Sequence, residues 1–311
     1  MGLCCCCIGS AGPMRKGCAY RPFPLLRKET IAEGSEFPVR KLTFALAEPD
    51  AELGFGQPTT HVKIRGPGAI IRGRTYSISH SAPGEFSITV KVRTNGWVSS
   101  YLDSLKIGDF AFFAATQTKT MALASGPVGF VAYGVGAAEL IHTIPSLLVG
   151  ASEESPVVLV LANRRAEDVI YAAEFAALEA TFGNRFRCYH VLSRDEGPSL
   201  ESSLHGTAGH TGRVLYERRV DAKLLRNVFG QWASREGHPP TFMVVGTRDM
   251  IRTTHAELAG LGLGCRLLGR PRLSQLLNSR PRSTLDHSIA LARVRADNLR
   301  RMSYCGSPIS D

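Results

Sequence analysis

Two short segments of the sequence carry residues that are suited to binding an anion. Arg74 offers a planar and permanently charged guanidinium, which can hold a phosphate group through two parallel hydrogen bonds. Ser99 lies where we expect a short helix to begin, and the backbone N–H groups of a helix N-terminus favour negative charge. Taken singly, Arg74 could equally be a surface charge and Tyr76 a core aromatic residue, so the surrounding elements decide between these interpretations.

Other kinds of catalytic chemistry have no matching motif in the sequence. The histidines form no His-Glu-x-x-His zinc motif, and His205 and His210 lie in a stretch rich in glycine and serine. No Gly-x-Ser-x-Gly segment would place a nucleophilic serine on a sharp turn. We therefore set aside hydrolases and metalloenzymes, and we expect no metal site.

Residues 37–118 show the two-residue periodicity of β-strands with one buried face. From Phe86 to Val92, hydrophobic residues occupy every second position and polar residues lie between them. Similar runs are separated by glycine and proline. Several short strands within roughly eighty residues predict a small antiparallel barrel.

The pattern changes after Ser125. Val128–Ala132 and Val157–Leu161 are apolar runs without alternation, which is typical of parallel strands buried on both faces. Further elements are expected, helices over Glu139–Leu148 and Ala166–Phe182, and strands over Arg187–Leu192 and Phe242–Val245. Strands and helices in alternation predict a doubly wound α/β domain with a parallel sheet.

The first anion-binding segment belongs to a longer pattern. Arg74-Thr75-Tyr76-Ser77 resembles the Arg-x-Tyr-Ser/Thr flavin motif of the ferredoxin-NADP reductase and cytochrome b5 reductase superfamily. Gly96-Trp97-Val98-Ser99-Ser100-Tyr101-Leu102 is similar to the Gly-x-x-Ser-x-x-Leu segment of that family, and a turn ending in Gly108-Asp109 follows it. The three matches occur in the order that the family shows.

This resemblance implies an FAD site in the barrel. It implies that Arg74 binds the pyrophosphate from one side, and that Ser99 and adjacent backbone amides bind it from the other. Tyr76 would pack its ring on the flavin and Ser77 would hydrogen-bond near N5, so these two residues would lie nearest the reaction. The other FAD-binding residues that the resemblance implies are Lys91, Val92, Gly96 and Val98.

The resemblance continues through the second half and implies a site for NADPH or NADH. The matching positions are Gly134 and Gly136 in a glycine-rich loop, Asn163 and Arg164 after one strand, Ser193 and Arg194 after the next, and Gly246 and Met250 in the last motif. Arg194 could bind the 2′-phosphate of NADPH, whereas Asp195 would repel it. The choice of nucleotide stays open, with a slight preference for NADPH.

Three residues depart from the family pattern in this second site. Val135 stands where the family has threonine, Glu139 where it has proline, and Val245 where it has a cysteine beside the nicotinamide. Valine can pack against a carboxamide but cannot hydrogen-bond it. Two functions therefore remain open: a working reductase, and a non-catalytic membrane-tethered interaction module with a degenerate nicotinamide site.

Residues 1–36 are expected to form a lipidated tail and linker. Gly2 could be myristoylated after removal of Met1, and a run of cysteines could take palmitate as a second chain, namely Cys4, Cys5, Cys6 and Cys7. Cys6 departs from the myristoylation pattern, which prefers serine or threonine at that position. A disordered tail and a soft-metal site are the alternatives. The other cysteines are too scattered for a disulfide framework, which predicts a reducing compartment.

Positive charge is concentrated near the C-terminal end. The formal net charge is +10, and residues 266–301 hold nine arginines against two aspartates, which gives +7. We expect residues 271–311 to be a basic extension that contacts an anionic membrane or an acidic protein, stays solvated, or docks on the second domain. Nucleic acid is not an expected partner, because no binding motif accompanies the arginines. The sequence contains no run of about 18 uncharged apolar residues, so no membrane-spanning helix is predicted.

The sequence thus predicts two domains, an antiparallel β-barrel FAD domain at residues 37–120 and an α/β doubly wound parallel-sheet NAD(P)-binding domain at residues 121–270. We expect an enzyme that passes electrons from NAD(P)H through FAD to an acidic one-electron acceptor, a haem or iron–sulfur protein. Its expected location is the cytoplasmic face of a membrane, held by lipid, or otherwise the cytoplasm.

Overall fold

The computed structural model describes residues 20–47, 61–65, 73–115, 126–150, 155–195, 213–216, 218–233 and 240–263. The expected acylation sites, Gly2 and Cys4 to Cys7, and the expected basic extension at 271–311 lie outside these residues. Within the stretches described, every helix is too short or too polar to cross a bilayer.

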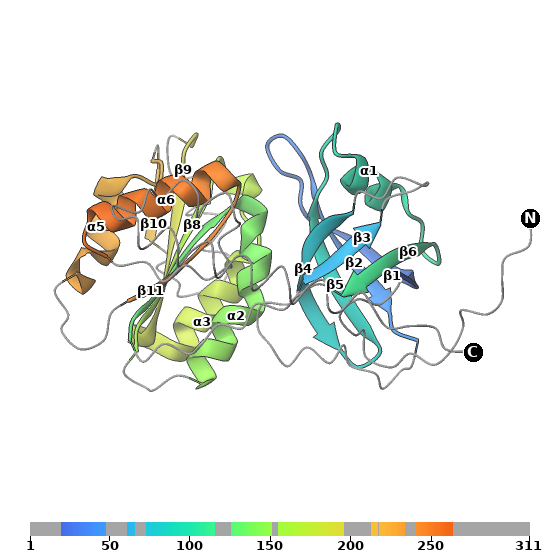
Figure 1. Ribbon diagram of the computed structural model, residues 1–311, viewed down its shortest axis with the longest axis horizontal. Helices are drawn as coiled ribbons and strands as arrows, with labels where there is room; N and C mark the ends of the chain where they lie inside the picture. Colours follow the sequence, from blue (N-terminus) through green and yellow to red (C-terminus); the bar gives the residue numbers. More distant parts are fainter. Residues whose placement is uncertain are drawn as a thin grey trace, which may run out of the picture. The chain divides into compact units, whose positions relative to one another are not determined.

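A closed antiparallel barrel forms the first part of the chain, with the strand order β1-β2-β5-β4-β3-β6 (Figure 1). Its strands are β1 (Arg21–Ala32), β2 (Val39–Ala45), β3 (His61–Arg65), β4 (Arg74–Ala82), β5 (Glu85–Lys91) and β6 (Phe110–Ala115). A short helix, α1 (Trp97–Ser104), lies between β5 and β6. The predicted barrel is therefore confirmed.

Aromatic side chains fill the interior of the barrel. Phe23, Phe44, Phe86 and Phe113 come from four different strands, and the contacting ring centroids are 4.7 to 5.7 Å apart. Most of these pairs meet edge to face, an arrangement that adds to the stability gained from burial. The core thus connects strands that are distant in sequence.

The prediction of a linker before residue 37 is wrong for the second half of that segment, because β1 occupies Arg21–Ala32. β1 pairs with β6 through Arg21–Pro24 and with β2 through Leu25–Ala32. Phe23 and Leu25 point inward and are buried, which is the strand signal in this segment. The prolines suggested a linker, but a strand tolerates proline where the missing N–H is not needed for pairing.

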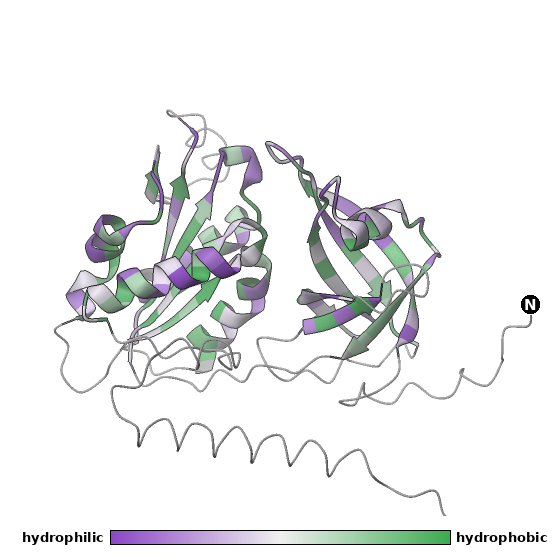
Figure 2. Ribbon diagram, turned by 45° about the horizontal axis from the view of Figure 1, so that its top comes forward, coloured by the Kyte–Doolittle hydropathy of each residue, from purple (hydrophilic) through white to green (hydrophobic). Residues whose placement is uncertain are grey.

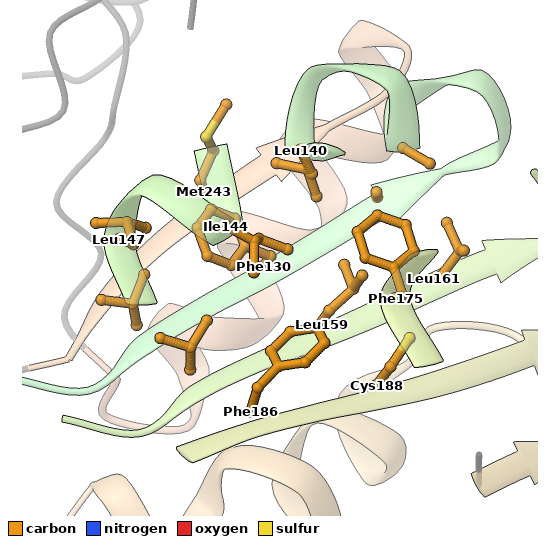
Figure 3. Close-up of a cluster of buried hydrophobic side chains, with 14 of the residues drawn as sticks. Phe130, Leu140, Ile144, Leu147, Leu159, Leu161, Phe175, Phe186, Cys188 and Met243 are labelled. Carbon is orange, nitrogen blue, oxygen red and sulfur yellow. The ribbon is translucent and has the colours of Figure 1, made fainter. Parts of the chain in front are cut away.

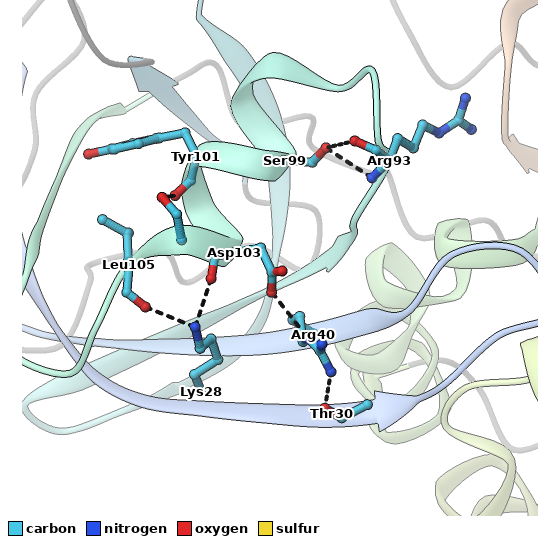
Figure 4. A network of polar contacts seen from close by, with 9 residues as sticks. Lys28, Thr30, Arg40, Arg93, Ser99, Tyr101, Asp103 and Leu105 are labelled. Atoms are coloured by element: carbon cyan, nitrogen blue, oxygen red, sulfur yellow. Dashed lines mark hydrogen bonds and ion pairs between the residues drawn. The ribbon is translucent and has the colours of Figure 1, made fainter.

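Helix α1 is fastened to β1 and β2 by charged side chains (Figure 4). Nζ of Lys28 donates to the backbone carbonyls of Asp103, at 2.7 Å, and Leu105, at 2.9 Å. Nε of Arg40 donates to the carboxylate of Asp103 at 3.0 Å. Lys28 thereby satisfies carbonyl groups that a helix C-terminus leaves without partners, and it fixes the orientation of α1.

The second part is a parallel sheet with the strand order β10-β9-β8-β7-β11. The strands are β7 (Val128–Tyr133), β8 (Val157–Asn163), β9 (Phe186–Leu192), β10 (Arg213–Leu215) and β11 (Thr241–Val245). The helices are α2 (Ala137–Gly150), α3 (Ala172–Phe182), α5 (Ala222–Phe229) and α6 (Arg248–Gly260). Every neighbouring pair of strands is parallel, which confirms the predicted α/β domain.

Both faces of this sheet are covered. Leu159 of β8 packs in a cluster with Ile144 of α2 and Phe175 of α3 (Figure 3). Val160, the next residue, joins a second cluster with Leu225 of α5 and Leu258 of α6. The strands are accordingly hydrophobic along much of their length (Figure 2), and this explains the apolar runs without alternation.

The helix expected over Ala166–Phe182 is interrupted. Residues Ala166–Asp168 form a single 3-10 turn, and α3 begins only at Ala172. Between them, Tyr171 has a φ of 60°, a left-handed conformation that residues with a side chain rarely adopt. Its hydroxyl lies 2.5 Å from Oγ1 of Thr89 in the barrel, so a tertiary contact overrides the helical periodicity here.

Candidate functional site

β4 carries the three residues that were expected to be central to the flavin site. Arg74 is exposed at the start of the strand, whereas Tyr76 and Ser77 are half-buried. Burial raises the pKa of Tyr76 to about 12, although the nearby charge of Arg74 acts in the opposite direction, so the phenol stays neutral. Because side chains alternate along a strand, Arg74 and Tyr76 share the face of their cross-strand partners Ile64 and Val62, and Tyr76 packs against the barrel core. Ser77 lies on the opposite face.

The turn before α1 is built around Gly96. Oγ of Ser99 donates to the carbonyl of Gly96 at 2.9 Å and accepts from the backbone N–H of Arg93 at 3.2 Å (Figure 4). A Cβ at Gly96 would lie 2.3 Å from Oγ of Ser99, so only glycine fits. Val98 is buried beneath the helix. Because the Ser99 hydroxyl is engaged within the turn, an anion here would meet backbone N–H groups of α1, which begins without a side-chain cap.

Lys91 and Val92, expected to border the flavin, lie at the end of β5. The backbone N–H of Val92 donates to the carbonyl of Pro38 at 2.9 Å. Nζ of Lys91 lies 3.4 Å from Oδ1 of Asp168. Oδ1 also accepts a hydrogen bond from the backbone N–H of Ser35 at 3.1 Å, and Oδ2 accepts one from the Ser35 hydroxyl at 2.7 Å. Burial alone would raise the pKa of Asp168, but the Ser35 hydrogen bonds and the charge of Lys91 outweigh it and lower that pKa. Lys91 thus joins the barrel to the α/β domain.

A histidine that the sequence did not single out lies beside Ser77. His61 of β3 is paired directly with Ser77 of β4 in the barrel. Nε2 of His61 lies 3.2 Å from Oε1 of Glu139, and both side chains are largely buried. Glu139, which stands where the family has proline, directs its carboxylate toward this histidine of the barrel.

The loop after β7 leaves room for a ligand at Gly134. Gly134 has a φ of +54°, and a Cβ there would meet only Oδ1 of Asn163, at 4.0 Å. Asn163 is buried at the end of β8, and neither Oδ1 nor Nδ2 has a hydrogen-bond partner within the described stretches. A buried amide without partners is costly, so a polar ligand at this edge of the sheet would satisfy it.

The neighbouring space toward β11 is filled. A Cβ at Gly246 would lie 2.9 Å from Cδ2 of Tyr133, so this ring contacts the Gly246 backbone directly. The hydroxyl of Tyr133 lies 2.7 Å from Oγ1 of Thr254 in α6. A Cβ at Gly136 would likewise lie 3.0 Å from Cγ1 of Val245. Tyr133 packs with the cluster of Leu225 and Leu258, and Val245 packs with the cluster of Ile144 and Phe175, so the two side chains lie against opposite faces of the sheet.

The residues expected at the adenosine end lie on the loop after β9. The backbone N–H of Ser193 donates to Asn163 O at 3.1 Å, and that of Arg194 donates to Arg164 O at 2.8 Å. The Arg194 side chain is exposed, and the carboxylate of Asp195 accepts a hydrogen bond from the backbone N–H of Ala166 at 2.6 Å. This bond fixes the Asp195 carboxylate on the loop, at the position next in sequence to Arg194.

Two more expected residues lie at the rim of the site. Arg164 is exposed and forms an ion pair with Glu36 of the β1–β2 loop. Met250 is exposed in the first turn of α6, where its backbone N–H is capped by Thr247. Both are accessible to a ligand at the ends of the strands.

The structure arranges the expected residues in two groups. One group lies on β4, the end of β5 and the α1 turn; it contains Arg74, Tyr76, Ser77, Lys91, Val92, Gly96, Val98 and Ser99. The other lies at the carboxyl ends of the parallel strands; it contains Gly134, Gly136, Asn163, Arg164, Ser193, Arg194, Gly246 and Met250. His61 and Tyr133 are additions, which only strand register and packing reveal. In the part of the chain described here, no group of acidic, histidine and cysteine side chains could hold a metal ion.

Both halves match known family models. Residues 22–121 match the oxidoreductase FAD-binding domain, and residues 130–256 match the oxidoreductase NAD-binding domain. Each match coincides with one of the two folded parts, and the first includes β1.

Related sequences carry the same name repeatedly. NADH-cytochrome b5 reductase 1 of Laccaria bicolor is 28% identical over 207 residues, which are 65% of this chain and 63% of that protein. NADH-cytochrome b5 reductase 1 of Meyerozyma guilliermondii is 26% identical over 228 residues, 68% of this chain and 73% of that protein. The chain thus spans less than two thirds of the Laccaria relative.

Solved structures share the fold. The cytochrome b5 reductase domain of Ulva prolifera nitrate reductase has a TM-score of 0.63 at 16% identity, covering 82% of this chain and 97% of that one. A ferredoxin NADP+ reductase from Neisseria gonorrhoeae, with bound FAD and NADP, has a TM-score of 0.58 at 18% identity, covering 78% and 92%. With both domains, their order and their motifs in agreement, this chain belongs to the ferredoxin-NADP reductase and cytochrome b5 reductase superfamily.

Proposed function

We propose that this FAD-dependent oxidoreductase takes electrons from NAD(P)H and passes them singly to a haem protein. The relatives described above are named NADH-cytochrome b5 reductases, and a protein of the same fold was solved with FAD and NADP. Bound FAD would supply the chemistry, since a flavin accepts a hydride and releases single electrons. The residues of this chain bind and orient the two cofactors.

The observation that carries the proposal most directly is the buried amide of Asn163. Both of its polar atoms lack partners among the residues described, beside a glycine that leaves open space. On the barrel, the exposed Arg74 and the engaged turn at Gly96 fit a pyrophosphate from two sides. These two features are what a dinucleotide site needs, namely polar groups without protein partners and backbone that a phosphate can approach.

Two side chains with ionisable groups, those of His61 and Glu139, lie near Ser77. His61 and Ser77 are cross-strand neighbours, and such pairs have Cβ atoms about 5 Å apart. Glu139 lies at ion-pair distance from the other side of the imidazole and holds its orientation. The strand register therefore places His61 beside Ser77, with the carboxylate of Glu139 next to the imidazole.

The test is an anaerobic stopped-flow measurement on the protein reconstituted with FAD. Rapid loss of the flavin absorbance band with NADH or NADPH would support the proposal, and the faster donor would identify the nucleotide. A bound flavin that neither donor reduces would contradict it.

The alternative, a non-catalytic module with a degenerate nicotinamide site, is not favoured. Its motivation is the set of departures from the family pattern at Val135, Glu139 and Val245. Against this alternative, the NAD-binding family model matches residues 130–256, and this match follows the match of the FAD-binding model along the chain. Thermal protection by NAD(P)H separates the two, because a ligand that binds the native state raises its melting temperature.

Attachment to the cytoplasmic face of a membrane is the remaining part of the proposal. It is supported by Gly2 and by the cysteine run Cys4 to Cys7, which offer sites for two or more acyl chains. The variant Gly2→Ala with Cys4 to Cys7 changed to Ser should move the protein from the membrane fraction to the soluble fraction of cells. Unchanged fractionation would contradict attachment by acylation.

A further inference from the structure

One outward face of the barrel is apolar without a role in the core. The ladder between β1 and β6 pairs Pro22 with Phe112 and Pro24 with Phe110. The neighbouring positions Ala111 and Phe113 point inward and are buried, so Phe110 and Phe112 point outward. The exposed fractions on this β1–β6 face are 73% for Ile107, 54% for Phe110, 44% for Phe112 and 37% for Leu26.

The four apolar side chains of the β1–β6 face lie near one another. The backbone of Leu25, next to Leu26, exchanges hydrogen bonds with the turn at Gly108 and Asp109, so Ile107 and Leu26 belong to the same end of the ladder. A half-exposed strand normally places polar residues outward, so two phenylalanines there are not needed for folding. Contiguous exposed apolar patches of this kind mark surfaces that contact another molecule or a membrane.

The contact must be made by side chains. Both edges of β6 are already paired, with β1 on one side and β3 on the other (Figure 1), so no further strand can be added. This excludes strand addition as a mode of binding at the β1–β6 face.

Basic residues border the apolar side chains. Arg65 of β3 is paired with Phe112 on the side opposite Pro22, and it is exposed. Lys106 is exposed and adjoins Ile107, and Lys63 lies two positions before Arg65. Asp109, an acidic residue at this edge, accepts a hydrogen bond from the backbone N–H of Lys106 at 2.8 Å. Aromatic rings bordered by basic groups fit the interface of an anionic bilayer, where rings enter the headgroup region and cations meet phosphates.

The connection to the N-terminal segment favours lipid over other occupants. β1 begins 14 positions after Cys7, and a chain of that length reaches at most about 50 Å. A tether of this reach gives the attached face a high effective concentration at the lipid surface. We propose that the β1–β6 face docks on an anionic lipid bilayer, an inference that rests on the proposed membrane attachment.

Docking in this way leaves the flavin residues accessible. In the ring order β1-β2-β5-β4-β3-β6, β4 is three strands away from β1 and so lies across the barrel. Arg74, Tyr76 and Ser77 would therefore face away from the lipid. An acceptor protein at the same membrane could then reach the flavin without displacing the barrel.

The test separates the face from the acyl chains. Full-length protein carrying Gly2→Ala and Cys4 to Cys7 changed to Ser, reconstituted with FAD, is sedimented with phosphatidylcholine vesicles that contain phosphatidylserine. We expect binding that falls roughly 100-fold in the double variant Phe110→Ser/Phe112→Ser, since burying each ring contributes about tenfold or more. The control is Val149→Ser, which removes an even more exposed apolar side chain from α2, at 79% exposure, and should bind as before.

Each result has one meaning. Equal vesicle binding by the double variant and the control would overturn the inference, and so would no binding by the non-acylated parent. Self-association that the double variant abolishes, without vesicle binding, would also overturn it and identify a second copy as the occupant. If cellular attachment does not depend on acylation but vesicle binding still requires Phe110 and Phe112, the acylation proposal fails and the docking face stands. Unchanged FAD binding by the double variant shows that it is folded.

Discussion

The flavin half and the nicotinamide half of the redox site differ in how open they are. On the barrel, Arg74 is exposed and α1 begins without a side-chain cap. On the sheet, Gly134 faces open space, but Tyr133 packs on Gly246 and Val245 packs on Gly136. We therefore expect the second half, at the carboxyl ends of the paired strands β7 and β11, to rearrange before a nicotinamide ring can bind there.

This difference shows that the two ends of the second site have different constraints. The pyrophosphate end, at Gly134 and Asn163, keeps unsatisfied polar groups that a ligand would pair. At the nicotinamide end, the ring of Tyr133 packs against Gly246 and the side chain of Val245 packs against Gly136. Substrate positioning, rather than cofactor binding to the barrel, should therefore limit the rate of this enzyme.

The largest effect is expected at the flavin half. Arg74→Ala should weaken FAD binding by roughly 30- to 150-fold, because hydrogen bonds to a charged group contribute about 2–3 kcal/mol. Titration of flavin fluorescence measures this. Arg187→Ala, which removes an arginine bonded to Asn184 on the sheet, is the control and should bind FAD normally. Equal losses in both variants would mean that net charge, and not the position of Arg74, determines binding.

The second effect concerns the connection between the halves. Asp168→Asn should lower the free energy of unfolding by about 2 kcal/mol, because Lys91 loses its charged partner in a half-buried place. The folded pKa of Asp168 is lowered, so its contribution is present above the ordinary value of 3.8 and is lost as the pH falls through the folded pKa. Urea unfolding should therefore show the two proteins converging in acid. A constant difference at all pH values would contradict this.

A third effect of similar size belongs to the sheet half alone. His190 is buried in β9, and burial lowers its pKa from 6.5 to about 4. Between pH 7 and pH 5 the unfolded chain gains a proton that the folded one does not, so the free energy of unfolding should fall by about 2 kcal/mol. His190→Gln should remove this slope. The same slope in the variant would assign the pH dependence to other groups.

The smallest expected effect tests the comparison most directly. Tyr133→Ala should tighten NAD(P)H binding about tenfold. In the parent protein the nicotinamide ring must first displace the Tyr133 ring, and a displacement that costs about 1.4 kcal/mol lowers the affinity tenfold. Tyr133→Phe keeps the ring and loses only the hydrogen bond to Thr254, so it should bind like the parent. Calorimetric titration of the FAD-loaded protein measures both. If Tyr133→Ala binds no better, the ring does not limit access and the two halves are alike.

Local motifs made the barrel half predictable. Arg74 to Ser77 lie on one strand, and Gly96 to Ser99 lie on one turn, so neighbouring positions in sequence became neighbouring positions in space. The same applies to the apolar runs of β7 and β8, whose burial on both faces follows from composition alone. Such features do not depend on distant parts of the chain.

Contacts between distant segments were not predictable. His61 lies beside Ser77 because of the register of β3 with β4, which no residue in either strand specifies alone. Tyr171 fits the helical periodicity of its segment, but its hydroxyl contacts Thr89 instead. Strand β1 was not predicted, because its prolines suggested a linker. In each case a partner far away in sequence decides the local structure.

The way β1 closes the barrel has a consequence for folding. The barrel is complete only when Arg21–Pro24 meets Phe110–Phe113, and this pairing joins the two ends of the domain. High contact order makes such a closure late, and Pro22 and Pro24 contribute no N–H donor to it. The ladder should therefore be the first to open, with faster amide hydrogen exchange than the β2–β5 ladder. Tension along an anchored N-terminal segment would act on this same seam, while the strands that bind the flavin remain paired.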